Sequence, residues 1–67
     1  MRIILIEEQY NPNPVHVNVG NISWVGDNGV NVQIGMVCGR TITTKFTDVH
    51  HALDYIRRAE TIKLTQE

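Results

Sequence analysis

The chain lacks the cysteine pairs and metal-ligand clusters that often stabilise small proteins. Its one cysteine, Cys38, cannot form an internal disulfide. Its three histidines and that cysteine do not stand at the spacings of a zinc site, so we expect no metal and no cofactor. The 67 residues predict a single domain over residues 1–67. A domain of this size buries only about 60% of the surface of its unfolded chain, so we expect a homo-oligomer, with contacts at sheet edges or on a polar strand face.

An excess of charge of either sign is also missing. Lys and Arg number six against seven Asp and Glu, which leaves a formal net charge of −1. The field of such a chain would not steer nucleic acid or an anionic membrane surface. The cations are scattered from Arg2 to Lys63 rather than gathered in a stripe. We therefore expect neither nucleic acid nor a membrane as a partner.

Long hydrophobic runs are absent as well. The longest unbroken run is Ile3-Ile4-Leu5-Ile6, whereas a membrane helix needs about 20 apolar residues. The run follows Arg2 directly and lacks the length and cleavage site of a signal peptide. A free cysteine without an export signal predicts a cytoplasmic protein.

Alternating and β-branched residues predict strands in the first third of the chain. Met1 to Glu7 is rich in isoleucine and predicts a strand that is buried on both faces or lies at an oligomer contact. The prolines of Tyr10–Pro14 predict a loop or an extended edge segment, because proline lacks the N–H that a sheet or helix needs. Val15, Val17 and Val19 then alternate with polar residues and predict a strand that ends in a bend at Gly20.

The stretch Ile22–Ile56 predicts a β-β-β-α unit. Asn28-Gly29 between two alternating stretches is typical of a hairpin with a type I′ turn. Gly39-Arg40 predicts the next turn, and Thr41 to Phe46 predicts a third strand. A helical stripe follows, with Thr47 or Asp48 as its N-cap, and consists of Val49, Ala52, Leu53, Ile56 and Ala59. The tail after it favours a turn and a short strand over an extension of the helix.

These elements predict an α+β fold: a small, mostly antiparallel sheet of about four strands with one amphipathic helix packed on one face. We expect the helix to pack on one face of the sheet, formed by Ile22, Trp24, Val30, Val32, Ile34 and Ile42. The opposite face carries Asn31 and Gln33, which should meet water or a partner.

Trp24, Asn31 and Gln33 are the candidate interface residues. Trp24 shares the face of Ile22 by simple alternation, so core packing is its expected place. A partly exposed Trp24 would instead be an interface anchor, because tryptophan is enriched at binding hot spots.

Arg40, Thr43, Lys45 and His50 are the candidate ligand-binding residues. They bring cations and a hydroxyl near the start of the helix, where anions are favoured. A nucleotide or another small anion held between subunits would use them. Asp48 at the same terminus would repel an anion, and no glycine-rich phosphate loop is present. Ordinary solvated strand polarity explains the same residues.

No residue pattern indicates catalysis. His50 and His51 are neighbours and point about 100° apart on a helix, so they cannot chelate a metal as a pair. Cys38 lies in no cysteine-hydrolase signature, and the burial preference of lone cysteines predicts a packed thiol. We expect that the protein is not an enzyme.

A longer pattern resembles the small flagellar FlbD-like family. It reads N-I-x-W-V from Asn21, V-x-V-x-I from Val30, G-R-T-I from Gly39 and A-L-x-Y-I-R from Ala52. The resemblance covers roughly two-thirds of the chain. It implies the β-β-β-α architecture and brings no catalytic residues. The Tyr10–Pro14 loop and the residues after Ala59 depart from the family pattern.

The sequence thus favours a non-enzymatic protein-binding module, homo-oligomeric and of a size suited to an accessory protein of a phage or an operon. The alternative is an oligomeric protein that binds a small anionic ligand or nucleotide between its subunits. The protein partner and the ligand are unidentified.

Overall fold

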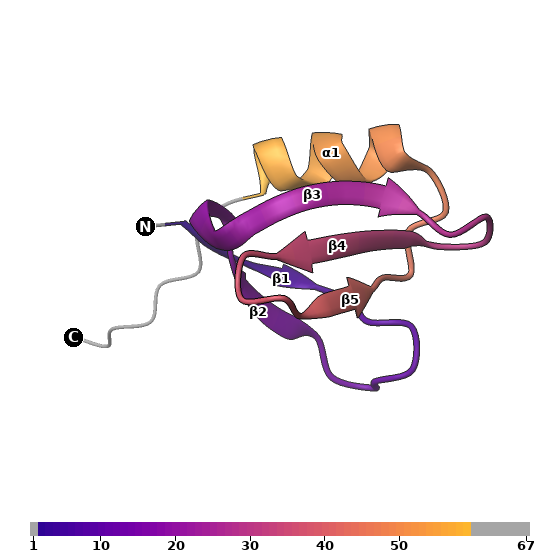
Figure 1. Ribbon diagram of the computed structural model, residues 1–67, viewed down its shortest axis with the longest axis horizontal. Coiled ribbons are helices and arrows are strands. Elements are labelled where there is room, and N and C mark those ends of the chain that lie inside the picture. Colours follow the sequence, from indigo (N-terminus) through magenta and orange to yellow (C-terminus); the bar gives the residue numbers. More distant parts are fainter. Residues whose placement is uncertain (1, 60–67) are drawn as a thin grey trace.

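A computed structural model describes residues 2–59 of the chain. Figure 1 shows their elements, which follow in the order β1 (Ile3–Ile6), β2 (Val15–Asn18), a 3₁₀ turn η1 (Val19–Asn21), β3 (Ile22–Asp27), β4 (Val32–Met36), β5 (Thr41–Thr43) and α1 (Val49–Arg58). The predicted tail strand falls at 60–67, outside the described residues. Among the described residues, no helix is long and apolar enough to cross a membrane.

The strands form two antiparallel sheets, β1-β2 and β3-β4-β5. The chain beyond β1 joins the chain beyond β5 through a bridge between Glu8 and Thr44. A hydrogen bond from the Gln9 N–H to the Thr43 carbonyl, 2.8 Å long, extends this pairing. The predicted α+β class is confirmed: two small antiparallel sheets carry one helix, with five strands where the sequence predicted about four.

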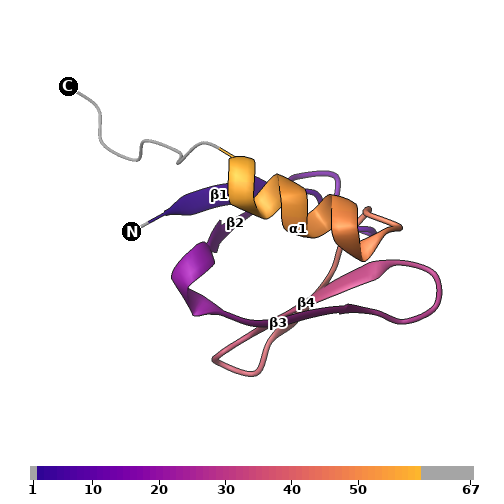
Figure 2. The same ribbon diagram turned by 90° about the horizontal axis from the view of Figure 1, so that it is seen from above.

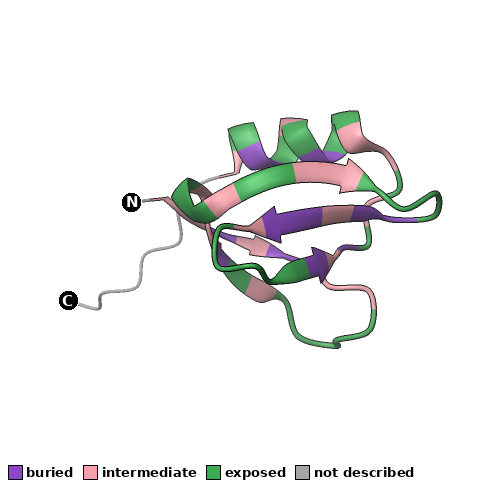
Figure 3. Ribbon diagram, viewed as in Figure 1, coloured by how far each residue is buried: buried purple, intermediate pink, exposed green. Residues whose placement is uncertain are grey.

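The core lies between the two sheets and the helix. The alternation of β1 directs Ile4 and Ile6 inward, where both are fully buried. They meet residues that lie far away in the sequence, and the cluster consists of Ile4, Ile6, Val17, Ile34, Ile42 and Ile56. Figure 3 shows buried residues along β4 and exposed residues along the middle of β3. Burial of isoleucine and valine supplies the main stabilisation, about 1.5–3 kcal/mol for each fully buried side chain.

Helix α1 is held at both ends by side chains. Asp48, one of the two predicted candidates, is its N-cap, and its carboxylate accepts a hydrogen bond from the His50 N–H at 3.2 Å. At the other end, the guanidinium of Arg2 donates to the carbonyls of Ile56 and Ala59 at 2.6 and 2.7 Å. A cation at the helix C-terminus satisfies carbonyls that lack helical partners and complements the helix dipole. Figure 2 shows α1 between β1 and the hairpin of β3 and β4.

The inner face of the helix is narrower than the sequence predicted. Ala52 and Ile56 are buried, and Tyr55 reaches β1, where its hydroxyl donates to the Leu5 carbonyl at 2.6 Å. Leu53 belongs to the predicted stripe but is 44% exposed. The helix has only ten residues and packs on a small core, so none of the described residues covers Leu53 fully.

The hairpin between β3 and β4 uses a different turn from the one predicted. A type I′ turn needs positive φ at both central residues, but Gly29 has a φ of 95° and Asn28 does not have positive φ. The Asn28 side chain instead accepts from the N–H groups of Val30 and Asn31, both at 2.9 Å. This four-residue connection carries Val30 outward, so its predicted place in the core is wrong: Val30 is 72% exposed.

The turn between β4 and β5 lies where Gly39-Arg40 predicted it. Gly39 has a φ of 96°, a conformation open to glycine, and its N–H donates to the Met36 carbonyl at 2.9 Å. Cys38 sits in this turn and is exposed, so the prediction of a packed thiol is wrong. A tight turn at the end of a hairpin points its side chains into solvent, and this position overrides the burial preference of cysteine.

Candidate functional site

Trp24 does not belong to the core. The register of β3 and β4 shifts between Ile22 and Trp24, so one residue of β3 has no partner opposite it. Such a bulge reverses the alternation beyond it and changes the face on which a side chain lies. Ile22 and Val25 pack against the core, whereas Trp24 turns to the outer face and is 47% exposed. The core place predicted for Trp24 is therefore wrong, and the exposed alternative describes its position.

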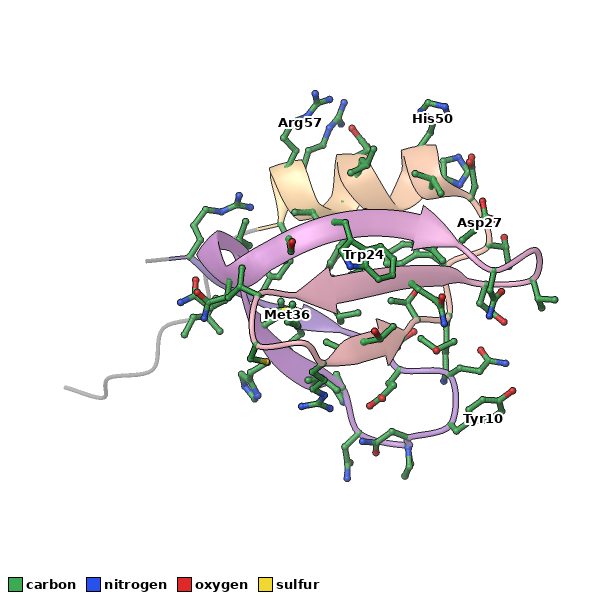
Figure 4. All side chains as sticks on the ribbon, viewed as in Figure 1. Tyr10, Trp24, Asp27, Met36, His50 and Arg57 are labelled. Atoms are coloured by element: carbon green, nitrogen blue, oxygen red, sulfur yellow. The ribbon has the colours of Figure 1, made fainter. Side chains whose placement is uncertain are left out.

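The indole ring of Trp24 packs over Gly35 and beside Gly26. Trp24 stands opposite Gly35 across the sheet, and a Cβ built on Gly35 would overlap Nε1 and Cε2 of the indole. A Cβ on Gly26 would lie 3.7 Å from Trp24 Cζ3, an ordinary contact distance. Gly35 is itself buried under the ring. Figure 4 shows Trp24 spread over the outer side of the sheet rather than projecting from its edge. The absence of a side chain at Gly35 thus lets the indole lie flat.

Neutral polar residues continue this surface across β4 and β5. Gln33 pairs with Gly26 on one side and with Thr43 on the other. Its side-chain amide donates to the Thr43 hydroxyl at 3.2 Å. Thr41 stands opposite Gly35 and is exposed. We call this surface the Trp24 face, and it consists of Trp24, Gly26, Gln33, Gly35, Thr41 and Thr43. No member carries a charge.

The structure separates the three predicted interface residues. Trp24 and Gln33 share the Trp24 face, but Asn31 does not belong to it. Asn31 is only 8% exposed, and its side-chain amide reaches the Gln9 side chain at 3.4 Å. The prediction that Asn31 faces water or a partner is wrong. Asn31 lies before β4 begins, in the turn, and the alternation that would have directed it outward does not yet apply there.

The four predicted ligand-binding residues do not converge within one subunit. Arg40 precedes β5 and Lys45 follows it, so about 16 Å of extended chain separates the two cations. Thr43 lies on the Trp24 face, bonded to Gln33. His50 is in the first turn of α1, and Figure 4 shows its side chain pointing away from the sheets. Within residues 2–59, the four residues thus lie on different elements and share no hydrogen bond or ion pair that would join them in one site.

A concave region lies where β1 meets α1. Its volume is about 460 Å³, and its walls are Leu5, Glu7, Pro14, Lys45, Phe46 and Tyr55. The rings of Phe46 and Tyr55 lie 5.5 Å apart at an angle of 47°. The Tyr55 hydroxyl is already bonded to the Leu5 carbonyl, and Glu7 and Lys45 bring opposite charges to the same rim. The pocket is mainly apolar and holds no converging set of polar groups.

The described residues show no arrangement for metal binding. Residues 2–59 contain no group of three or more His, Cys, Asp or Glu side chains placed to hold an ion. His51 lies 3.7 Å from Asp48 at the exposed start of the helix, a contact between neighbours on one helical turn.

Sequence reasoning missed Gly26 and Gly35 as parts of the site. Each appears in the sequence as an isolated glycine within a strand, a pattern that marks close approach of another group. That pattern does not show which group approaches. The answer depends on the bulge between Ile22 and Trp24, which decides that the indole and Gly35 share a face.

In comparisons with known proteins, no family model, curated protein or solved structure matched this chain. The resemblance to the FlbD-like family therefore stays a prediction from the sequence pattern.

Proposed function

We propose that this chain is a non-enzymatic binding module that forms a homo-oligomer and docks a protein partner on the Trp24 face. The observation that carries the proposal is the half-exposed indole of Trp24, turned outward by a bulge and laid flat on Gly35. Tryptophan is among the residues most enriched at binding hot spots. An indole that is already ordered loses little conformational freedom when a partner covers it.

The oligomer would form at the edge strand β2. Among the described strands, β2 pairs with β1 alone, whereas β3, at the end of the other sheet, also contacts α1. A strand with one free edge offers backbone N–H and C=O groups to a second chain. This contact would join the β1-β2 sheets of two chains through their β2 strands. It would leave the Trp24 face of each chain open.

Light scattering of the full chain over a wide concentration range tests the oligomer. The expected mass is a multiple of the 7.6 kDa of one chain. Hydrogen exchange then locates the contact, because amide protons of Val15–Asn18 should gain protection as the oligomer forms. A monomer at every concentration would exclude the homo-oligomer, and protection confined to other strands would exclude the β2 contact.

A further inference from the structure

The Trp24 face is small for the surface of a folded partner. Its three strands span about 14 Å, and the three residues from Trp24 to Gly26 along β3 span about 10 Å, which makes a patch of about 140 Å². A standard protein–protein interface buries about 800 Å² on each partner. The area therefore fits a thin ligand, one chain segment wide, better than a second folded domain.

The chemistry of the face selects an uncharged ligand that has flat apolar groups and exposed hydrogen-bond acceptors. None of its six residues is charged, so it offers nothing to a phosphate backbone. The indole presents a broad apolar surface together with an Nε1–H donor. None of the side-chain hydrogen bonds among residues 2–59 uses that donor, and Trp24 is half-exposed. Thr41 and Thr43 add hydroxyl groups about 5–10 Å away across the sheet.

From these features we infer that the Trp24 face binds an extended, proline-containing segment of a partner protein in the polyproline II conformation. This inference rests on the proposed function and specifies its partner. Proline rings provide the flat apolar groups that stack on an aromatic surface. A polyproline II segment has no internal hydrogen bonds, so its carbonyls are free to accept from Nε1–H and from the threonine hydroxyls. Its low conformational entropy also suits a small contact area.

The flat pose of the indole is the part of the geometry that a substitution can remove. An alanine methyl at Gly35 would overlap the ring and force it off the sheet, whereas a methyl at Gly20, outside the Trp24 face, would lie 3.4 Å from Asn18 Oδ1, an ordinary contact distance. Gly35→Ala and Gly20→Ala are thus a matched pair of glycine substitutions: the first displaces the indole, and the second lies in η1, away from the Trp24 face. Trp24 is the only tryptophan, so tryptophan fluorescence reports on the Trp24 face alone.

The experiment titrates the full chain with capped decaproline and follows Trp24 emission, with a capped Gly-Ser peptide of equal length as the control ligand. We expect saturable binding of decaproline and none of Gly-Ser. Trp24→Ala should weaken binding about 30-fold or more, the effect of losing a hot-spot side chain. Gly35→Ala, read by calorimetry, should weaken it about tenfold or more, while Gly20→Ala should change it less than about twofold. Circular dichroism confirms that each variant is folded.

Several outcomes would overturn the inference. The inference fails if decaproline does not bind, or if the Gly-Ser peptide binds equally well. It also fails if the folded Trp24→Ala variant binds decaproline as tightly as the unchanged chain. Tight binding of a short oligothymidylate instead of the peptide would assign the face to nucleobases. A mass that falls in light scattering on Trp24→Ala would assign the face to a second copy of the chain. An oligomer unaffected by Trp24→Ala, together with no decaproline binding, would remove the inference and leave the proposed oligomer intact.

Discussion

The contact between Arg2 and the end of α1 allows a quantitative test of what stabilises the fold. Arg2 joins the start of the chain to the last turn of the helix, more than fifty residues later, through bonds to the carbonyls of Ile56 and Ala59. A third, longer contact of 3.4 Å reaches the Arg57 carbonyl. Arg2→Ala removes all of these bonds and the guanidinium that satisfies the last carbonyls of the helix.

The expected loss follows from the number and setting of these bonds. A hydrogen bond to a charged group contributes about 1.5–3 kcal/mol. Arg2 is only half-buried, so water replaces part of what the truncation removes. We expect a loss of about 2 kcal/mol for Arg2→Ala in total. For a domain of this size, each kcal/mol corresponds to about 4–8 °C, so the melting temperature should fall by about 8–16 °C.

The assay is thermal unfolding followed by circular dichroism, with Arg57→Ala as the matched control. Arg57 is an arginine on the same helix, but its side chain is 80% exposed, and among residues 2–59 it pairs with Asp54, at 3.6 Å. Exposed pairs of this kind contribute about 0.2–1 kcal/mol. Arg2→Lys, which keeps the charge but loses the planar fork, should fall between the two. Equal melting temperatures for Arg2→Ala and Arg57→Ala would refute the assigned role of Arg2.

Two further predictions concern the core and one turn. Thr44 is fully buried, and its hydroxyl donates to the Val32 carbonyl and accepts from the Phe46 N–H. Thr44→Val should therefore lower the free energy of unfolding by about 1–3 kcal/mol in urea titrations, because it leaves the Phe46 N–H without an acceptor. Thr44→Ser keeps the hydroxyl and should lower it less. A larger loss for Thr44→Ser than for Thr44→Val would contradict the assignment. Gly39→Ala should cost about 1 kcal/mol, because the φ of 96° is strained for alanine while open space surrounds it; no loss in the same titration would show that the turn relaxes.

Local signals in the sequence predicted the parts of the fold that depend on near neighbours. Asp48 caps the helix that Val49, Ala52 and Ile56 indicated, because a cap and a helical stripe act within a few residues. The turn at Gly39 was predictable for the same reason. The strand of Ile4 and Ile6 was evident from its isoleucine run, although its pairing partners were not.

The errors occurred where distant segments decide the position of a residue. Asn31 is buried because Gln9, 22 residues earlier, passes beside it. Trp24 is exposed because the pairing of β3 with β4 contains a bulge, and simple alternation does not reveal a bulge. Of the predicted site residues, Trp24 and Gln33 thus share a face with Thr43, while Arg40, Lys45 and His50 lie apart from it.

The sequence by itself determined the α+β class, the helix and the positions of the main turns, together with the lack of a disulfide and of a strong net charge. These properties depend on composition and on contacts between residues that are close in the chain. Only the tertiary structure decided that Trp24 lies flat over Gly35 on an open face, and that Arg2 holds the end of α1. Both depend on which segments meet in space, and a shift of a single residue in strand register moves a side chain from one face of a sheet to the other.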